Sequence, residues 1–284
     1  MLSATSGFLP FFLPLFLCIF ISCDPGAPVE SPPLRVYFID VGQGDACLLR
    51  TPGNRSFLYD IGNRPAFLPA FLTKAGVDTL ETVFITHPDL DHYGSFTTLF
   101  QRIPVKKVVL PPRDSPNPAW REFMRVLDAA HIQRDTLFSG DSRIWEPGLH
   151  AKVLWPPKHY SGSDNDISLV LRVEHRGGNL LLTGDIEADA EQGLMISGFA
   201  LETDILKVSH HGSRTSSTLP FLAGSRPSWA IISCDSAVYG HPHSETLAGL
   251  DLIIGNKERI LRTDREGTVA FEVDDFGVRR VGEE

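Results

Sequence analysis

Two histidines and two aspartates lie within six consecutive residues of the segment ITHPDLDHYGS: His87, Asp89, Asp91 and His92. They follow an apolar, strand-like run, ETVFIT, and Gly94 allows the chain to turn sharply after them. A strand delivers its last residues to one edge of a sheet, so these side chains can converge on one or two cations. Imidazole nitrogen suits zinc and iron, and carboxylate oxygen suits manganese and magnesium. The alternative is a polar turn in which an aspartate caps a helix, but this dense pattern favours a metal site.

Three further polar groups follow apolar runs along the chain. Asp185 ends LLLTGD, His210 and His211 follow in LKVSHHGS, and the segment GHPH adds His241 and His243. Six of the ten histidines fall in these groups and in the first motif. Surface histidines scattered by chance would show no such placement. The pattern therefore predicts one shared site built from the ends of several strands.

The elements that must position this site alternate between strand-like and helix-like runs. Glycine and proline between the first three strand-like runs indicate tight turns. The mixture predicts an α/β (α+β) domain in which helices cover sheet layers, rather than a purely parallel sheet. Strands are predicted at 34–40, 45–51, 56–62, 81–86, 105–112, 150–157 and 228–235, a strand running into a loop at 204–213, hairpins at 168–185 and 259–275, and helices at 68–76, 119–131, 189–197 and 244–254.

The N-terminal residues form a separate region. The run FLPFFLPLFLCIFI, residues 8–21, has no charge but is shorter than the roughly 20 residues of a membrane-spanning helix. Its length suits a signal peptide, and FISC, ending at Cys23, resembles a bacterial lipobox. We therefore expect a lipoprotein-type signal peptide at 1–23, a Pro-rich linker at 24–33 and one folded domain at 34–284 that carries the histidine motifs. The alternatives are a simple secretory peptide and an uncleaved anchor.

Charge and cysteine content limit the function classes. The formal net charge of −9 argues against a protein that coats nucleic acid. It does not argue against an enzyme that uses cations to approach a phosphate. Cys47 and Cys234 lie in apolar stretches where a disulfide is one option, and no CxxC pair indicates a cysteine zinc site.

The order of the motifs resembles a known family. HxDxDH, then TGD, then HHGS is the motif order of the metallo-β-lactamase superfamily, with Asp89 where most members carry a second histidine. IDVGQGDACLL, LKVSHHGSRTSS and YGHPH resemble the hydrolase domain of ComEC-type competence proteins, over Leu34 to Phe271. The resemblance implies a four-layer αββα sandwich with the active site at one edge. Counterparts of that family's channel and DNA-binding domain do not occur in these residues, so only the chemistry is expected to carry over.

The resemblance also implies roles for the site residues. His87 and Asp89 would hold a first metal, Asp91 and His92 a second, and Asp185 would bridge both. One of His210 and His211 would be a ligand, and the other would contact substrate or donate a proton; spacing leaves that choice open. The family's third-motif histidine is missing, and Asn165 or Asp166 stands near its position. The implied catalytic residues are Asp91, His210 and His241, and the implied metal ligands are His87, Asp89, Asp91, His92, Asp185, His210 and His211.

Electrostatics indicates the substrate class. Three carboxylates at Asp89, Asp91 and Asp185 against two divalent cations leave one net positive charge, which favours an anionic group such as phosphate. Oxygen-rich ligation favours manganese or similar hard ions, and zinc is the other option. Two such ions can generate a hydroxide and stabilise the charge of a phosphodiester undergoing hydrolysis.

Residues near these motifs have more than one reading. Ser213, Ser216 and Ser217 fit either hydrogen bonds to phosphate or helix capping. His241 fits substrate contact and a proton relay to the leaving group, whereas His243 fits a cap for the helix that begins at Ser244. We expect DVGQGD to form a tight turn, with an approach of Gln43 or Asp45 to the site as the alternative. We further expect Asp60 to be a structural carboxylate, and Lys207 and Arg214 are candidates to contact phosphates of nucleic acid.

The leading hypothesis is therefore an exported phosphodiesterase or nuclease that cleaves DNA with two divalent ions. It would be lipid-anchored to a membrane, with competence or uptake machinery as a candidate partner. A second hypothesis keeps the metals but assigns a small phosphodiester, a lactone or a cell-surface ester as substrate. A third is a non-catalytic nucleic-acid-binding module.

Overall fold

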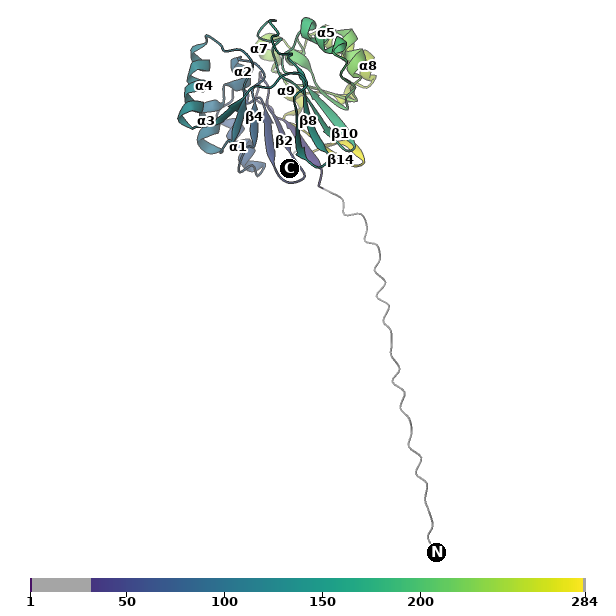
Figure 1. Cartoon of the computed structure of the whole chain (residues 1–284). Helices are drawn as coiled ribbons and strands as arrows, with labels where there is room; N and C mark the ends of the chain where they lie inside the picture. The colour runs from purple at the N-terminus through teal and green to yellow at the C-terminus, as the bar shows by residue number, and fades with distance from the viewer. Residues whose placement is uncertain (2–31, 283–284) are drawn as a thin grey trace. The chain divides into compact units, whose positions relative to one another are not determined.

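Two β-sheets form the centre of the domain (Figure 1). The structure is a computed structural model that describes residue 1 and residues 32–282. Apart from residue 1, the predicted signal peptide lies outside these described residues, as does nearly all of the predicted linker. None of the described helices is both long and apolar enough to span a membrane.

The first sheet has eight strands in the order β15-β14-β1-β2-β3-β4-β5-β6. The pairs from β15 to β3 are antiparallel, and the pairs from β3 to β6 are parallel. Its strands are β1 (Leu34–Phe38), β2 (Cys47–Arg50), β3 (Ser56–Tyr59), β4 (Thr82–Phe84), β5 (Lys107–Val109), β6 (Gln133–Asp135), β14 (Val269–Asp274) and β15 (Gly277–Val281).

The second sheet has seven strands in the order β13-β12-β11-β10-β9-β8-β7. Strands β10 to β13 run parallel, and β7 to β10 form antiparallel pairs. Its strands are β7 (Ser142–Glu146), β8 (Leu149–Trp155), β9 (Val170–His175), β10 (Gly178–Leu182), β11 (Ile205–Lys207), β12 (Trp229–Ile232) and β13 (Ile260–Arg262).

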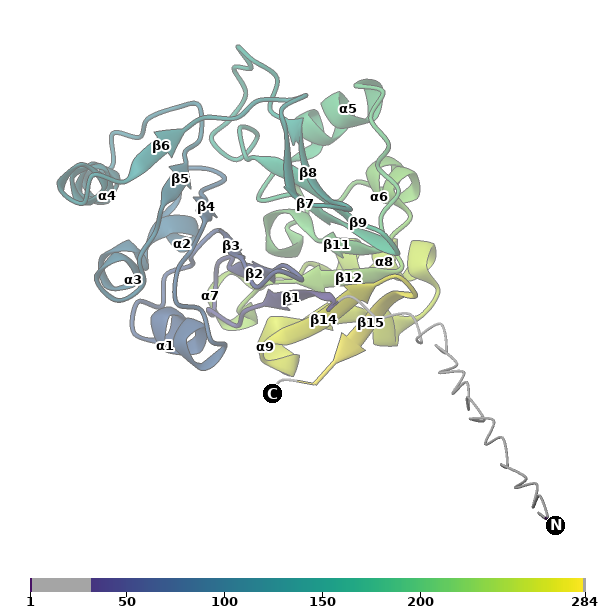
Figure 2. The ribbon, with the colours of Figure 1, turned by 60° about the horizontal axis from the view of Figure 1, so that its bottom comes forward.

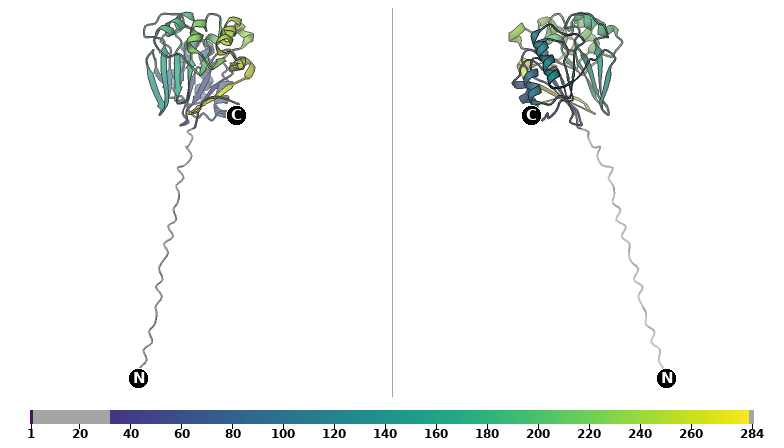
Figure 3. Two further views of the ribbon diagram at one scale, coloured as in Figure 1. Left: turned by 90° about the vertical axis from the view of Figure 1, so that its right-hand side faces the viewer. Right: turned by 60° about the vertical axis from the view of Figure 1, so that its left-hand side comes forward.

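Helices cover the outer face of each sheet, as Figures 2 and 3 show. Helices α1, α3 and α4 lie on the flank of the first sheet, and α5, α6 and α8 on the flank of the second. The helices are α1 (Phe67–Lys74), α2 (Leu90–Tyr93), α3 (Phe96–Arg102), α4 (Pro118–Ala129), α5 (Ala188–Ile196), α6 (Leu219–Ser225), α7 (Ser236–Tyr239), α8 (Ser244–Ile254) and α9 (Thr263–Glu266), with 3-10 turns η1 (Ser209–Gly212) and η2 (Lys257–Arg259). The four-layer αββα sandwich is confirmed.

Both faces of the central strands are buried. Side chains alternate along β2 and β3, so Phe57 and Tyr59 face the space between the sheets while Leu48 and Leu58 face the helices. This double burial explains why the strands appear as nearly continuous apolar runs in the sequence. Cys47 and Cys234 are both buried and both free, so the disulfide is absent.

Tyr59 connects the two sheets through a buried hydrogen bond. Its hydroxyl group, on β3, donates to the carbonyl oxygen of Leu169 at 2.5 Å, immediately before β9. Tyr37 on β1 has no such bond from its hydroxyl group among the described residues, and its ring packs edge-on against Phe71 of α1.

We expect Tyr59→Phe to lower the free energy of unfolding by about 1–3 kcal/mol, because it leaves the buried carbonyl of Leu169 without its donor. Tyr37→Phe is the matched control, and its expected change is within about 0.5 kcal/mol. Denaturant unfolding of both variants measures the difference. Equal losses in the two variants would contradict the role of this bond.

Candidate metal centre

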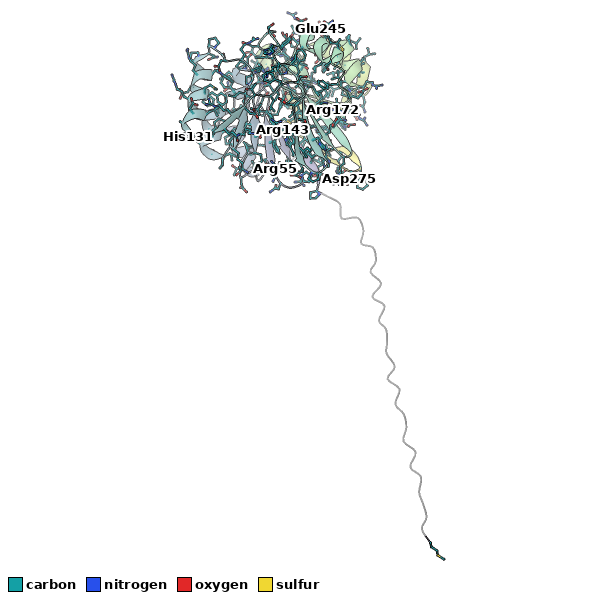
Figure 4. All side chains as sticks on the ribbon, viewed as in Figure 1. Arg55, His131, Arg143, Arg172, Glu245 and Asp275 are labelled. Carbon is teal, nitrogen blue, oxygen red and sulfur yellow. The ribbon has the colours of Figure 1, made fainter. Side chains whose placement is uncertain are left out.

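The predicted site residues meet at one edge of the sandwich. The neighbouring strands β3 and β4 are parallel, as are β10, β11 and β12, so within each sheet their carboxyl ends share an edge. In Figure 4, Glu245 in the first turn of α8 lies at the upper end of the domain, whereas Arg55 and Asp275 lie at the lower end. The histidine-bearing loops before α8 thus lie at the end opposite the β14–β15 turn.

Three imidazoles point their Nε2 atoms at one carboxylate oxygen. The Oδ2 atom of Asp185 lies 3.9 Å from Nε2 of His87, 3.3 Å from that of His92 and 3.2 Å from that of His211. Asp91 Oδ2 lies 3.3 Å from His211 Nε2, and Asp89 Oδ2 lies 3.7 Å from His87 Nε2. The first motif, Asp185 and His211 therefore come together as the motif order implied.

The other nitrogen of each ring is held by a fixed partner. His92 Nδ1 lies 2.8 Å from Asp60 Oδ2, and His211 Nδ1 lies 2.8 Å from the carbonyl oxygen of Ser233. His87 Nδ1 is close to the hydroxyl groups of Thr86 (3.0 Å) and Ser168 (3.2 Å). Such partners behind metal-binding histidines fix the ring orientation and the tautomer.

Asp60 has the structural role that we expected from the sequence. It is completely buried and accepts hydrogen bonds from the backbone nitrogen and the hydroxyl group of Thr86, both at 2.9 Å. It thereby connects β3 to the residue before His87 and orients His92 at the same time.

The atoms that face one another in this cluster lack hydrogen-bond partners. The Nε2 atoms of His87, His92 and His211 are buried without one. A buried polar atom without a partner costs about 1–3 kcal/mol, so three at one point require a group that accepts their lone pairs. A divalent cation fits. Four sets of described residues place their ligand atoms within 4.8 Å of one another, among them His87, His92 and Asp185, and Asp91, His92 and His211.

The charges of the cluster also favour a cation. Burial alone would lower the pKa of His92, but the carboxylates of Asp185 and Asp60 outweigh it and raise that pKa well above its usual value. Burial would raise the pKa of Asp185, but His211, His92 and Lys207 hold it well below its usual range. Metal binding displaces protons from such ligands.

Adjacent residues His210 and His211 point in different directions. Both have left-handed backbones, with φ of 49° and 55°, and they are followed by Gly212 at 81°. His211 enters the buried cluster, whereas His210 Nδ1 lies 3.3 Å from Glu187 Oε1 and is only partly buried. The geometry thus places His211 among the candidate ligands and His210 outside them.

An open cavity of about 460 Å³ lies over the cluster. Ser213, Arg214, His241 and His243 contribute to its walls, but Ser216 does not, and the hydroxyl oxygen of Ser216 is buried. The substrate contact expected of Ser216 therefore does not fit its position. The cavity is lined by Gln43, Asp89, Asp91, Asp185, His210, His211, Ser213, Arg214, Thr215, Tyr239, His241 and His243.

The loop of residues 40–45 lies directly against the first motif. Gly44 has φ of 124°, and a Cβ atom there would lie 2.2 Å from the carbonyl oxygen of Asp91. The backbone nitrogen of Asp45 donates to that same oxygen at 3.2 Å. Gln43 and Asp45 both approach the site, Gln43 at the cavity wall and Asp45 in the buried cluster.

Comparison with known proteins identifies the family. The model of the metallo-beta-lactamase superfamily matches residues 39–231. The chain belongs to the metallo-beta-lactamase superfamily. This match confirms the prediction that the chain has the fold of this family of metal-dependent hydrolases.

Competence proteins are among the relatives of this superfamily member. The chain is 31% identical over 264 residues to "ComE operon protein 3" of Bacillus subtilis, and this alignment covers 86% of the chain and 34% of that protein. It is 32% identical over 271 residues to "Competence protein ComA" of Neisseria gonorrhoeae, and this alignment covers 93% of the chain and 36% of that protein. The chain thus spans about a third of the length of these relatives, and the predicted resemblance to ComEC-type competence proteins is confirmed.

A solved structure supports the fold alone. The metallo-beta-lactamase fold protein YhfI from Bacillus subtilis superposes with a TM-score of 0.52 at 11% identity, covering 80% of this chain and 95% of that protein.

The chain departs from the superfamily motif near the first predicted metal. Asp166 is buried and accepts a hydrogen bond from the backbone nitrogen of Glu187, so its side chain is directed to the start of α5. Ser168 lies in the cluster instead, where its hydroxyl group contacts His87 and accepts from the backbone nitrogen of Asp185 at 3.1 Å. Reasoning from sequence missed Ser168, because a lone serine before an apolar strand carries no signal.

The prediction that Lys207 contacts nucleic-acid phosphates is wrong. Its side chain is 2% exposed, and its ammonium group forms an ion pair with Asp45 inside the domain. The charge count also changes. With Asp45, Asp60 and Lys207 included, five carboxylates, one ammonium group and two divalent cations would sum to zero rather than to one positive charge.

We expect His211→Ala to weaken zinc or manganese binding at least about tenfold, since loss of residues behind the ligands alone costs about 10–100-fold. His210→Ala, the adjacent control, should leave metal content nearly unchanged. Metal per chain after dialysis, measured by mass spectrometry, compares the two. Loss of metal from His210→Ala with retention by His211→Ala would contradict the assignment.

Proposed function

We propose that this protein is a metal-dependent phosphodiesterase that hydrolyses DNA. The observation that carries the proposal is the set of buried, unpartnered imidazole and carboxylate atoms at the floor of an open cavity. The exposed Arg214 on the cavity wall supplies a cation for a phosphate. The names of the competence relatives support DNA as the substrate and uptake machinery as a partner.

Two divalent ions, zinc or manganese, are proposed as cofactors. His87 and Asp89 would hold the first ion, Asp91, His92 and His211 the second, and Asp185 would contact both. When bound, such a pair supplies Lewis acidity and a hydroxide at neutral pH. Ser168 does not replace the missing third-motif histidine as a strong ligand, because its hydroxyl group already bonds to His87 and Asp185.

The residues of the cavity wall would bind the substrate and move protons. Ser213 and Arg214 would donate hydrogen bonds to the non-bridging phosphate oxygens. Burial and the neighbouring His211 and His210 lower the pKa of His241 to about 4, so its imidazole is neutral at neutral pH. A neutral imidazole fits a proton acceptor better than a proton donor to the leaving group. The ring centre of His210 lies 5.9 Å from that of His241. His210 would assist the proton transfer that involves His241.

A second candidate is an esterase that acts on a small phosphodiester. The charge count favours it, because a neutral metal-loaded cluster gives no long-range attraction for a polyanion such as DNA. The net charge of −9 also disfavours attraction of DNA, which is itself negatively charged.

We expect the manganese- or zinc-loaded protein to cleave bis-p-nitrophenyl phosphate and single- or double-stranded DNA. Asp185→Asn should reduce both activities to background, because it removes a charge that both metals would share. Asp275→Asn, at the opposite end of the domain (Figure 4), is the control with full activity. Cleavage of the small diester alone would favour the second candidate, and no turnover with any metal would favour a non-catalytic binding module.

We also propose that the chain is exported and anchored to a membrane through a lipid on Cys23. The uncharged run at residues 8–21 and the FISC segment support this proposal. Cys23→Ser should abolish incorporation of labelled palmitate and release the protein from the membrane fraction. Cys18→Ser, within the apolar run, should do neither. Labelling that persists in Cys23→Ser would refute the anchor.

A further inference from the structure

Lys207 is a buried cation directly behind the candidate metal centre. It is the last residue of β11, in the middle of the second sheet. Its Nζ atom pairs with Asp45 Oδ2, lies 3.6 Å from Asp185 Oδ1 and donates to the carbonyl oxygen of Gly184 at 3.1 Å. Burial alone would lower the pKa of Lys207, but Asp45 and Asp185 outweigh it and raise that pKa, so the ammonium group stays charged.

Asp45 is close enough to the cluster to compete for a metal ion. Its side chain is 3% exposed, and its Oδ1 atom lies 3.5 Å from His211 Nδ1. Its Oδ2 atom lies 3.9 Å from His92 Nδ1. Asp45, Asp185 and His211 also place one ligand atom each within 4.8 Å of one another. Without Lys207, this carboxylate would be a buried anion with two imidazoles and the carboxylates of Asp185 and Asp60 beside it.

Asp185 divides its two oxygens between two cation positions. Oδ2 faces the three imidazole Nε2 atoms, whereas Oδ1 faces Lys207. An ammonium group at Oδ1 excludes a metal ion from that side, because two cations at one oxygen repel each other. The oxygen that remains for metal is Oδ2.

We propose that Lys207 is a positioning residue of the metal centre: it keeps Asp45 out of the ligand set and restricts Asp185 to binding metal through Oδ2. This inference rests on the proposed metal centre, but not on the substrate. Lys207 also sets the total charge. Five carboxylates and two divalent ions alone would leave one negative charge, and the ammonium group removes it.

The two members of the pair should therefore shift metal affinity in opposite directions. Lys207→Met frees Asp45 to bind a cation, so we expect affinity for Mn²⁺ to rise at least about tenfold. Asp45→Asn leaves the ammonium group with Asp185 alone, so we expect affinity to fall at least about tenfold. The double variant Asp45→Asn/Lys207→Met removes both charges and should return to within a few-fold of the wild-type affinity.

Titration of the full protein with Mn²⁺, followed by electron paramagnetic resonance of the free ion, measures these affinities. Thermal unfolding is the second readout: Lys207→Met should have a lower Tm without metal and a larger metal-induced rise in Tm than the wild type. Lys152→Met, at a partly exposed lysine of β8 in the same sheet, is the control. It should change neither the affinity for Mn²⁺ nor the metal-induced rise in Tm.

A purely structural ion pair predicts a different pattern. Both single variants would then lose affinity, and Lys207→Met would gain no extra stabilisation from Mn²⁺; either result overturns the inference. If Lys207→Met fails to fold, Asp45→Asn and the double variant still decide, since a double variant no better than Asp45→Asn also overturns it. Failure of the wild type to bind Mn²⁺ or Zn²⁺ would instead refute the metal centre itself.

Discussion

Three imidazole nitrogens and one carboxylate lie against one another in the interior of the domain. The structure of this edge of the domain depends on how their charges and lone pairs are compensated. Such atoms are stable together only when a cation or shared protons compensate them, since isolated polar groups in an apolar interior are costly. The surrounding residues serve this arrangement. Asp60, Thr86, Ser168 and Ser233 hold the opposite ring nitrogens, so that each imidazole can present only Nε2 to the cluster.

The charges around the cluster are more nearly balanced than the motif residues alone indicate. Asp45 and Asp60 add two anions that no metal motif contains, and Lys207 offsets one of them. If the proposed function is right, attraction for an anionic substrate would come from the cavity wall, where Arg214 is exposed, rather than from the buried centre. The residues that would hold metal are then distinct from the residue that would attract the substrate.

Apolar runs predicted sheets covered by helices, clustered histidines predicted one shared site, and the αββα sandwich followed from the resemblance of the motifs to a known family. The edge strand β6 (Gln133–Asp135) contains no apolar residue and β7 (Ser142–Glu146) buries only Trp145, so neither showed a usable alternation. The choice between His210 and His211 depended on two successive left-handed residues, which no spacing rule reveals. The place of Lys207 depended on a long-range partner at Asp45, and a lysine at a strand end is more often exposed.

The candidate ligands come from two parts of the chain that are far apart in sequence. His87, Asp91 and His92 follow β4 of the first sheet, whereas Asp185 follows β10 and His211 follows β11 of the second. Neither segment alone supplies all the residues of the proposed metal centre, so an ion bound there would contact both halves of the chain at once. Such an ion would link the edges of the two sheets, and its removal would take away contacts between them.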